Sequence, residues 1–234
     1  MPEFNKFEQK KAEFLQLVSN FDETTHGNAC FSRISEISKE IGKTSKIIPI
    51  LKLFMLTEPI LWENIKNKVW PDEELQEENH FYFLQGDLLQ ANKIVTVDQA
   101  RTQHEFSYCI TRQPTCELVK GRAQETRLFR VSPCQRVTEE DRKLNSDLYK
   151  AFAIACRFNS PKFFPLPAMD IDDPDVLGYL VYLSLPYFLL EEDASDAIPL
   201  ASLSVKGWHL YNAAIQHAET RANINDELAL RIQT

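Results

Sequence analysis

The sequence predicts an α+β protein, with a helical N-terminal domain over residues 1–71 and a small, curled β-barrel with inserted and C-terminal helices over residues 80–234. Apolar residues recur three and four positions apart in the first third, which is typical of packed helices. After residue 80, short β-branched and aromatic runs follow one another closely, as in a small barrel. A chain of 234 residues with 44% hydrophobic and 26% charged residues is long enough to bury a core.

Four helices are expected in the N-terminal domain. Apolar spacings of three, four and seven predict an amphipathic helix over residues 3–19. Residues 20–28 are rich in turn-forming types, so the second helix is expected to begin at Ser32, and Gly42 stands where a left-handed cap would end it. A third helix follows, and a fourth is expected over residues 57–69.

The third helix is expected to begin at Thr44 or Ser45 and to reach residue 56, with Pro49 near its first turn, where a missing N–H is tolerated. A glycine-like turn followed by a polar helix start, over residues 32–56, resembles the helix-turn-helix of winged-helix DNA-binding domains. The resemblance implies a nucleic-acid-binding regulator.

The side chains that would contact nucleic acid in that interpretation are Thr44, Ser45, Lys46 and Lys52. A recognition helix must show polar groups to base edges, whereas residues 47–56 are mostly apolar. The competing interpretation is therefore a helix buried in a small helical cap. Residues 1–70 hold ten basic and nine acidic side chains, against 16 and 25 in the remainder, so the charge permits a nucleic-acid role only for the first third.

The barrel is predicted from short strands that follow an acidic connector at residues 72–79. The β-branched, aromatic or alternating runs that predict strands are at residues 80–84, 88–89, 94–97, 106–110, 127–131, 163–167, 176–183 and 200–203. Two prolines favour an edge position for residues 163–167. Residues 176–183 are apolar on both faces, which favours a central position, and Gly178 within them suggests a bulge.

Two stretches of helix are expected within and after these strands. Thr138 and Asp141 approximate a capping box at the start of the first, which ends near Pro161. A final helix is expected over residues 208–222, with a separate short helix over residues 225–232.

Residues 86–133 contain a dense group of polar side chains that we call the polar knot. Its members are Asp87, Thr115, Glu117 and Arg122. A carboxylate at a tight strand start and a nearby guanidinium usually hold a loop together, so Asp87 is expected to pair with Arg112 or Arg122. The knot is interpreted as structural, and the alternative is that this pair forms the floor of a binding site.

Cys116 is the candidate nucleophile within the same stretch. A thiol needs a base or a positive field to become a thiolate, and Arg112, Lys120, Arg122 and His104 are the candidates to supply them. The alternative is a buried cysteine that packs as a small apolar side chain. If the chain is an enzyme, its catalytic residues are expected to be Cys116, Arg122 and Arg112.

Four side chains are potential soft metal ligands, namely His104, Cys109, Cys116 and Cys134. No pair of them has the two-residue gap of a zinc knuckle. No metal and no other cofactor is therefore predicted.

Gly86-Asp87, with Val131-Ser132-Pro133 later in the chain, resembles the SH3-like barrels of the MazF/PemK toxin group. In that group a Gly-Asp pair opens the first core strand, and a Val-Ala-Pro-type strand follows. The resemblance implies an SH3-like β-barrel and a prokaryotic defence or toxin–antitoxin setting. Those toxins cleave RNA with groups that follow an Arg-Pro turn, whereas this chain has Gln113-Pro114.

The stretch from Thr115 to Arg122 is also similar to uncharacterised prokaryotic proteins with a Thr-x-x-Cys-Asp-Leu pattern followed by an arginine. Here Thr115 directly precedes Cys116, and Glu117 replaces the aspartate. This second resemblance implies no particular activity.

No complete catalytic constellation emerges, so the predicted function is that of a non-catalytic adaptor or regulator that binds a protein partner. Five cysteines at irregular spacings without a signal peptide predict a reducing, cytoplasmic location, and the apolar run at residues 47–56 is too short to span a membrane. The alternatives are the nucleic-acid-binding regulator and a barrel ribonuclease or thiol enzyme centred on Cys116 and Arg122.

Overall fold

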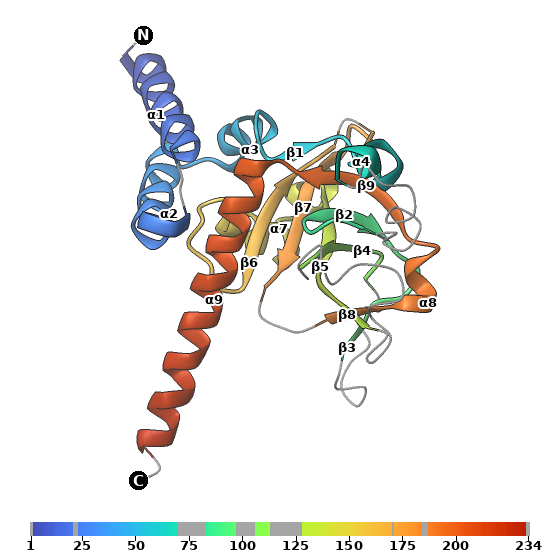
Figure 1. The fold of residues 1–234 in the computed structure, drawn as a ribbon. Helices are drawn as coiled ribbons and strands as arrows, with labels where there is room; N and C mark the ends of the chain where they lie inside the picture. The colour runs from blue at the N-terminus through green and yellow to red at the C-terminus, as the bar shows by residue number, and fades with distance from the viewer. Residues whose placement is uncertain are drawn as a thin grey trace. The chain divides into compact units, whose positions relative to one another are not determined.

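The computed structural model describes residues 2–20, 23–69, 83–96, 106–112, 128–169, 171–183 and 187–232. The α+β prediction is confirmed, because a helical N-terminal region precedes a curled antiparallel sheet that forms half of a barrel (Figure 1). An SH3-like strand arrangement stays a prediction.

The chain divides into two compact units, and each is assembled from segments that are distant in sequence. Unit 1 consists of Met1–Met55, Arg136–Ser184 and Ser204–Thr234, and unit 2 consists of Leu56–Gln135 and Leu185–Leu203. The predicted domains, by contrast, follow the chain order. Their boundary, between residues 71 and 80, lies outside the described residues.

Unit 1 contains most of the helices. They are α1 (Pro2–Ser19), α2 (Glu23–Ile41), α3 (Thr44–Lys52), α6 (Glu139–Leu144), α7 (Asp147–Ala155) and α9 (Val205–Ile232). The first predicted helix is confirmed. The second begins at Glu23 rather than Ser32, since an internal Gly or Asn weakens a helix by only about 1 kcal/mol or less. The last two predicted helices are one continuous helix.

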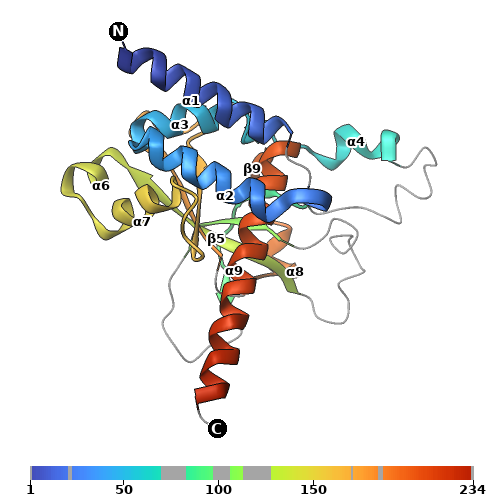
Figure 2. The same ribbon diagram turned by 90° about the vertical axis from the view of Figure 1, so that its left-hand side faces the viewer.

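Helices α1 and α2 pack side by side (Figure 2). Phe14 and Val18 of α1 and Ile34 and Ile37 of α2 are buried, and this apolar burial is the main stabilising contribution. Ion pairs flank the packed faces, with Lys10 Nζ 2.8 Å from Glu40 Oε2 and Arg33 Nη2 2.6 Å from Glu13 Oε1.

Two strands of unit 1, β6 (Phe163–Pro167) and β7 (Val176–Tyr182), pair antiparallel. β6 ends the strand order, as predicted, and the prolines at positions 165 and 167 remove N–H groups that another strand would need. β7 lies between β6 and β5 in the strand order, so it is not an edge strand, but it lies next to the edge rather than at the predicted central position. Phe158 and Phe164, with ring centroids 5.8 Å apart, continue the core of this unit.

Unit 2 holds the other elements of the described residues. They are β1 (Leu56–Thr57), α4 (Trp62–Val69), β2 (Asp87–Gln90), β3 (Val95–Thr96), β4 (Tyr108–Thr111), the first part of β5 (Leu128–Thr138), β8 (Tyr187–Leu190), α8 (Glu191–Ala194) and β9 (Ile198–Leu203). Neighbouring strands follow the order β1-β9-β2-β4-β5, and β8 pairs with both β5 and β3.

Most predicted strands of this unit are confirmed near their expected positions, while β8 was not predicted. Of the strand expected over residues 80–84, residues 80–82 lie outside the described residues, and residues 83–84 are not a strand. β2 lies between β4 and β9, and Leu88 and Leu89 are fully buried in it.

Candidate functional site

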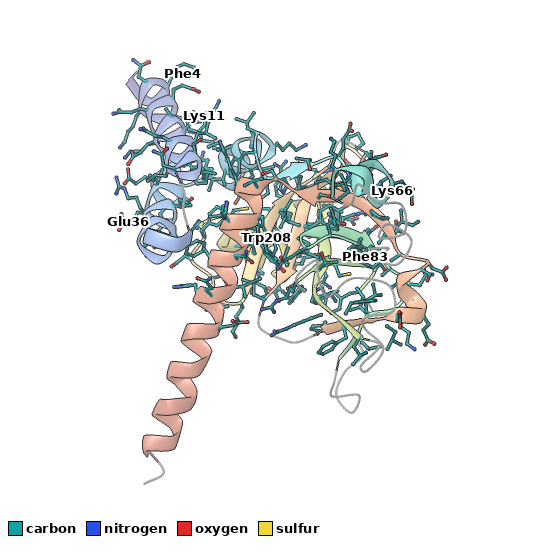
Figure 3. The ribbon with its side chains drawn as sticks, viewed as in Figure 1. Phe4, Lys11, Glu36, Lys66, Phe83 and Trp208 are labelled. Atoms are coloured by element: carbon teal, nitrogen blue, oxygen red, sulfur yellow. The ribbon has the colours of Figure 1, made fainter. Side chains whose placement is uncertain are left out.

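The part of the polar knot that the structure describes is centred on Asp87, the first residue of β2. Asp87 is 2% exposed, and Phe83, labelled in Figure 3, is buried just before the turn that leads into it. The Gly86 N–H donates to the Thr111 carbonyl (3.1 Å), and the Leu203 N–H donates to the Gly86 carbonyl (3.0 Å). The start of β2 is therefore fixed between β4 and β9.

The carboxylate of Asp87 accepts hydrogen bonds at both oxygens. The Ser202 hydroxyl donates to Oδ1 (2.6 Å), and the Leu84 N–H donates to Oδ2 (2.8 Å). The Asp87 N–H donates to Thr111 Oγ1 (3.0 Å), and that hydroxyl donates to the Leu84 carbonyl (2.6 Å). Ser202 Oγ in turn accepts from the Ile60 N–H (2.9 Å). The backbone and side chain of Asp87 together thus join three strands and a turn.

Burial raises the pKa of Asp87 from 3.8 to about 6, although the hydrogen bonds from Ser202 and Leu84 favour the ionised form. The removal of the carboxylate from water thus outweighs the two hydrogen bonds. Asp87 is almost fully buried, and each of its carboxylate oxygens accepts a hydrogen bond from within the fold, which favours the structural interpretation.

The predicted partners of Asp87 are only partly described. Thr115, Cys116, Glu117 and Arg122 lie outside the described residues, and so does His104. Arg112 is buried directly after β4, where its N–H donates to the Arg130 carbonyl (3.0 Å) and its carbonyl accepts from Gln85 Nε2 (3.1 Å). Pairing of Asp87 with an arginine, and thiol catalysis by Cys116, stay predictions.

The sequence reasoning missed Ser202 and Thr111 as members of this cluster. Ser202 is 115 residues from Asp87, and no local signal links the two positions. Thr111 directly follows the strand predicted over residues 106–110, so its position beside the turn follows only from the pairing of β4 with β2.

Cys109, Cys134 and Cys156 are buried free thiols. Burial raises the pKa of Cys109 to about 12 and raises the pKa values of Cys134 and Cys156 as well. A thiol with a raised pKa is not a nucleophile at neutral pH. The described residues also contain no group of three or more His, Cys, Asp or Glu side chains arranged for a metal ion.

The exposed face of α3 is the second candidate site. Ile47, Ile50 and Leu51 are buried, as the competing interpretation of a packed helix expects. The predicted nucleic-acid contacts lie elsewhere on the helix, with Ser45, Lys46 and Lys52 exposed and Thr44 half-buried. The helix ends at Lys52, short of the predicted residue 56, and Pro49 lies inside it rather than near its first turn.

The end of α3 is joined to the start of α9 through Ser204. The Ser204 N–H donates to the Met55 carbonyl (3.0 Å), and its hydroxyl donates to the Phe54 carbonyl. Leu53 is 61% exposed and Val205 is 73% exposed on either side of this junction. Trp208, labelled in Figure 3, is half-buried one turn further along α9.

We call this region the α3–α9 surface. It consists of the exposed residues Lys46, Pro49, Lys52, Leu53, Val205 and Lys206. Because it combines aliphatic side chains with lysines, it can contribute both apolar burial and charge pairing to a complex.

None of the described helices combines the length and apolarity that a membrane span requires. Comparison of the chain with protein-family models and with curated proteins finds no match.

Proposed function

We propose that this chain is a non-catalytic interaction protein, an adaptor or regulator that binds a protein partner. The observation that carries the proposal is the exposure of Leu53 and Val205 on either side of the hydrogen-bonded junction of two helices. Grouped aliphatic side chains on a surface are typical of a docking site, whereas single ones are ordinary.

The chemistry of unit 2 supports a role without catalysis. Both carboxylate oxygens of Asp87 accept hydrogen bonds within the fold, and the thiols of Cys109, Cys134 and Cys156 are buried with raised pKa values. Buried free thiols fit a reducing compartment, which supports the proposed cytoplasmic location. The resemblance to toxin-type barrels supports a prokaryotic defence or toxin–antitoxin setting as part of the proposal.

The test is a quantitative pull-down from cells that express the chain with its neighbouring genes. The double variant Leu53→Asp/Val205→Asp places two carboxylates at the centre of the surface, and Ile171→Asp is the matched control at a 72% exposed aliphatic residue elsewhere in unit 1. We expect a partner that the wild type and the control capture and that the double variant loses. A partner retained equally by all three proteins would show that it binds outside the α3–α9 surface.

A nucleic-acid-binding regulator is the second candidate, favoured by the exposed side chains of Ser45, Lys46 and Lys52 on α3. Binding to duplex DNA would be measured by fluorescence anisotropy over a range of salt concentrations. A nucleic-acid interface predicts affinity that falls steeply with salt and is lost in Lys46→Glu. Absence of binding at low salt would exclude it.

A further inference from the structure

We propose that the α3–α9 surface binds an acidic amphipathic segment of its protein partner. The inference rests on the proposed function, since it names the chemistry of the partner that an adaptor would bind. It follows from the arrangement of apolar and basic side chains on two joined helix ends.

The exposed side of α3 carries two apolar side chains, Pro49 and Leu53, together with two lysines. Lys46, Pro49 and Leu53 follow at spacings of three and four, which places them on one side of the helical segment. Lys52 is exposed beside Leu53. The opposite side is buried, so this exposed stripe is available for a partner.

The start of α9 extends the stripe with a second aliphatic residue. Ser204 holds this start against the end of α3, and its hydroxyl also accepts from the Gly207 N–H (3.0 Å) in the first turn of α9. Val205 and Lys206 follow immediately and are exposed. Both aliphatic anchors therefore project from fixed helix ends, so binding them loses little conformational entropy.

The positive charge of the surface favours a negatively charged partner. Residues 43–55 hold three lysines and residues 204–218 hold one, and neither stretch contains a carboxylate, although the whole chain has 34 acidic and 26 basic side chains. The surface is thus a basic region of an acidic protein, which complements an acidic segment.

The contacts that the structure gives to these lysines leave their charge available. Lys46 Nζ lies 5.1 Å from the centroid of the Phe7 ring, and Lys206 Nζ donates to the Ser19 hydroxyl (2.9 Å). Neither contact neutralises the ammonium group. By comparison, Lys10 in the same unit lies within 3.0 Å of two carboxylates.

The aliphatic residues decide between an acidic protein segment and a nucleic acid. Leu53 and Val205 have no favourable contact to make with a phosphate backbone, which is recognised by charged and hydrogen-bonding groups. An amphipathic helix offers apolar anchors three and four positions apart with carboxylates on either side, and it matches both features of the surface.

The experiment measures binding of the full chain to a fluorescein-labelled synthetic peptide of leucine and glutamate with its leucines on one helical face. A peptide of the same composition with its leucines spread around the helix, a peptide with lysine for glutamate and a labelled duplex DNA are the comparison probes. One double variant, Leu53→Ser/Val205→Ser, removes the apolar anchors. The other, Lys46→Glu/Lys52→Glu, reverses the charge.

We expect the amphipathic acidic peptide to bind, and each double variant to weaken it by about tenfold or more. Ile171→Ser and Lys143→Glu are matched controls, because they change exposed residues of the same types elsewhere in unit 1 and should leave binding unchanged. All substituted side chains are exposed, so melting temperatures close to that of the wild type will show that the variants fold.

Three outcomes would overturn the inference, and the third would leave the proposed function standing. The first is equal peptide binding by the wild type and both double variants. The second is tighter binding of the duplex than of any peptide, with loss in Lys46→Glu/Lys52→Glu. If no peptide binds but the pull-down partner still depends on Leu53 and Val205, the acidic chemistry is wrong while the proposed function holds. If capture of the pull-down partner does not depend on Leu53 or Val205, the proposed function itself fails at this surface.

Discussion

Asp87 is a buried carboxylate whose raised pKa makes the stability of the fold depend on pH. Its neutral form fits the buried site better than its ionised form does, because ionisation leaves a charge in a site from which water is excluded. The contribution to stability is therefore fully present below the unfolded-state pKa of 3.8 and is lost as the pH rises through about 6.

The free energy of unfolding is expected to change accordingly. A difference of this size between the pKa values in the two states corresponds to about 3 kcal/mol, which the wild type should lose between pH 4 and roughly pH 7. Asp87→Asn removes the titrating group and should remove this part of the pH dependence. Urea denaturation followed by tryptophan fluorescence at several pH values measures the effect.

Asp173→Asn is the matched control, since it replaces an exposed carboxylate and should keep the slope of the wild type. An unchanged slope in Asp87→Asn would show that Asp87 is not responsible. The place of Asp87 at the start of a strand was predictable, because it follows Gly86 and precedes an apolar pair. Its partner Ser202 was not, because strand pairing and not sequence proximity brings the two together.

Gly178 in β7 is a position at which the neighbouring strand β6 leaves no room for a side chain. The register of β7 with β6 is regular through Gly178 and Pro167, so the bulge suggested by the sequence is absent on the side facing β6. The reason for glycine is a close approach instead. A Cβ at this position would lie 2.3 Å from the Leu166 carbonyl oxygen and 2.9 Å from Phe152 Cζ.

Gly178→Ala should therefore lower the free energy of unfolding by about 3 kcal/mol, since the backbone of β6 must shift to admit a methyl group. Gly42→Ala is the comparison. It meets no atom closer than 3.6 Å and has only the strain of a positive φ, about 1–2 kcal/mol. Thermal and urea denaturation of both variants test which of them loses more free energy of unfolding. A smaller loss for Gly178→Ala than for Gly42→Ala would contradict the close approach.

The capping box before α6 is a local feature that the sequence predicted. The Asp141 N–H donates to Thr138 Oγ1 (3.3 Å), and the Thr138 N–H donates to Asp141 Oδ2 (2.9 Å). Thr138→Ala removes the first of these bonds and should cost about 1 kcal/mol of stability. Thr138→Ser keeps the hydroxyl and should restore most of it. Equal losses in the two variants would show that the cap contributes nothing.

Local signals of this kind explain which elements were predictable. The cap at Thr138 and the turn at Gly42 depend on residues three or four positions apart, so the sequence shows them directly. The early start of α2 and the position of Pro49 inside α3 were not predicted, because packing in the assembled unit decides how far a helix extends. The exposed face of α3 was predictable, whereas its junction with α9 was not.

At the scale of the whole molecule, the sequence predicted the α+β class and most strands but not their assembly. The alternation that predicts a strand carries no information on which strand pairs with it. The chain passes between the two units four times, after Met55, Gln135, Ser184 and Leu203. Segments of the two units therefore alternate along the chain, and no unit consists of one continuous segment.

This connectivity predicts that the two units unfold together. Cys109 and Cys134 belong to unit 2 and Cys156 to unit 1, and all three thiols are buried, so iodoacetamide should modify them only when their unit opens. Mass spectrometry of modified peptides across a urea series should give one midpoint for the three sites.

Gly178→Ala destabilises unit 1 and should shift the midpoints of Cys109 and Cys134 as far as that of Cys156. Early modification of Cys156 alone in that variant would show that unit 1 opens while unit 2 remains folded, and that passage of the chain between the units does not couple their stability.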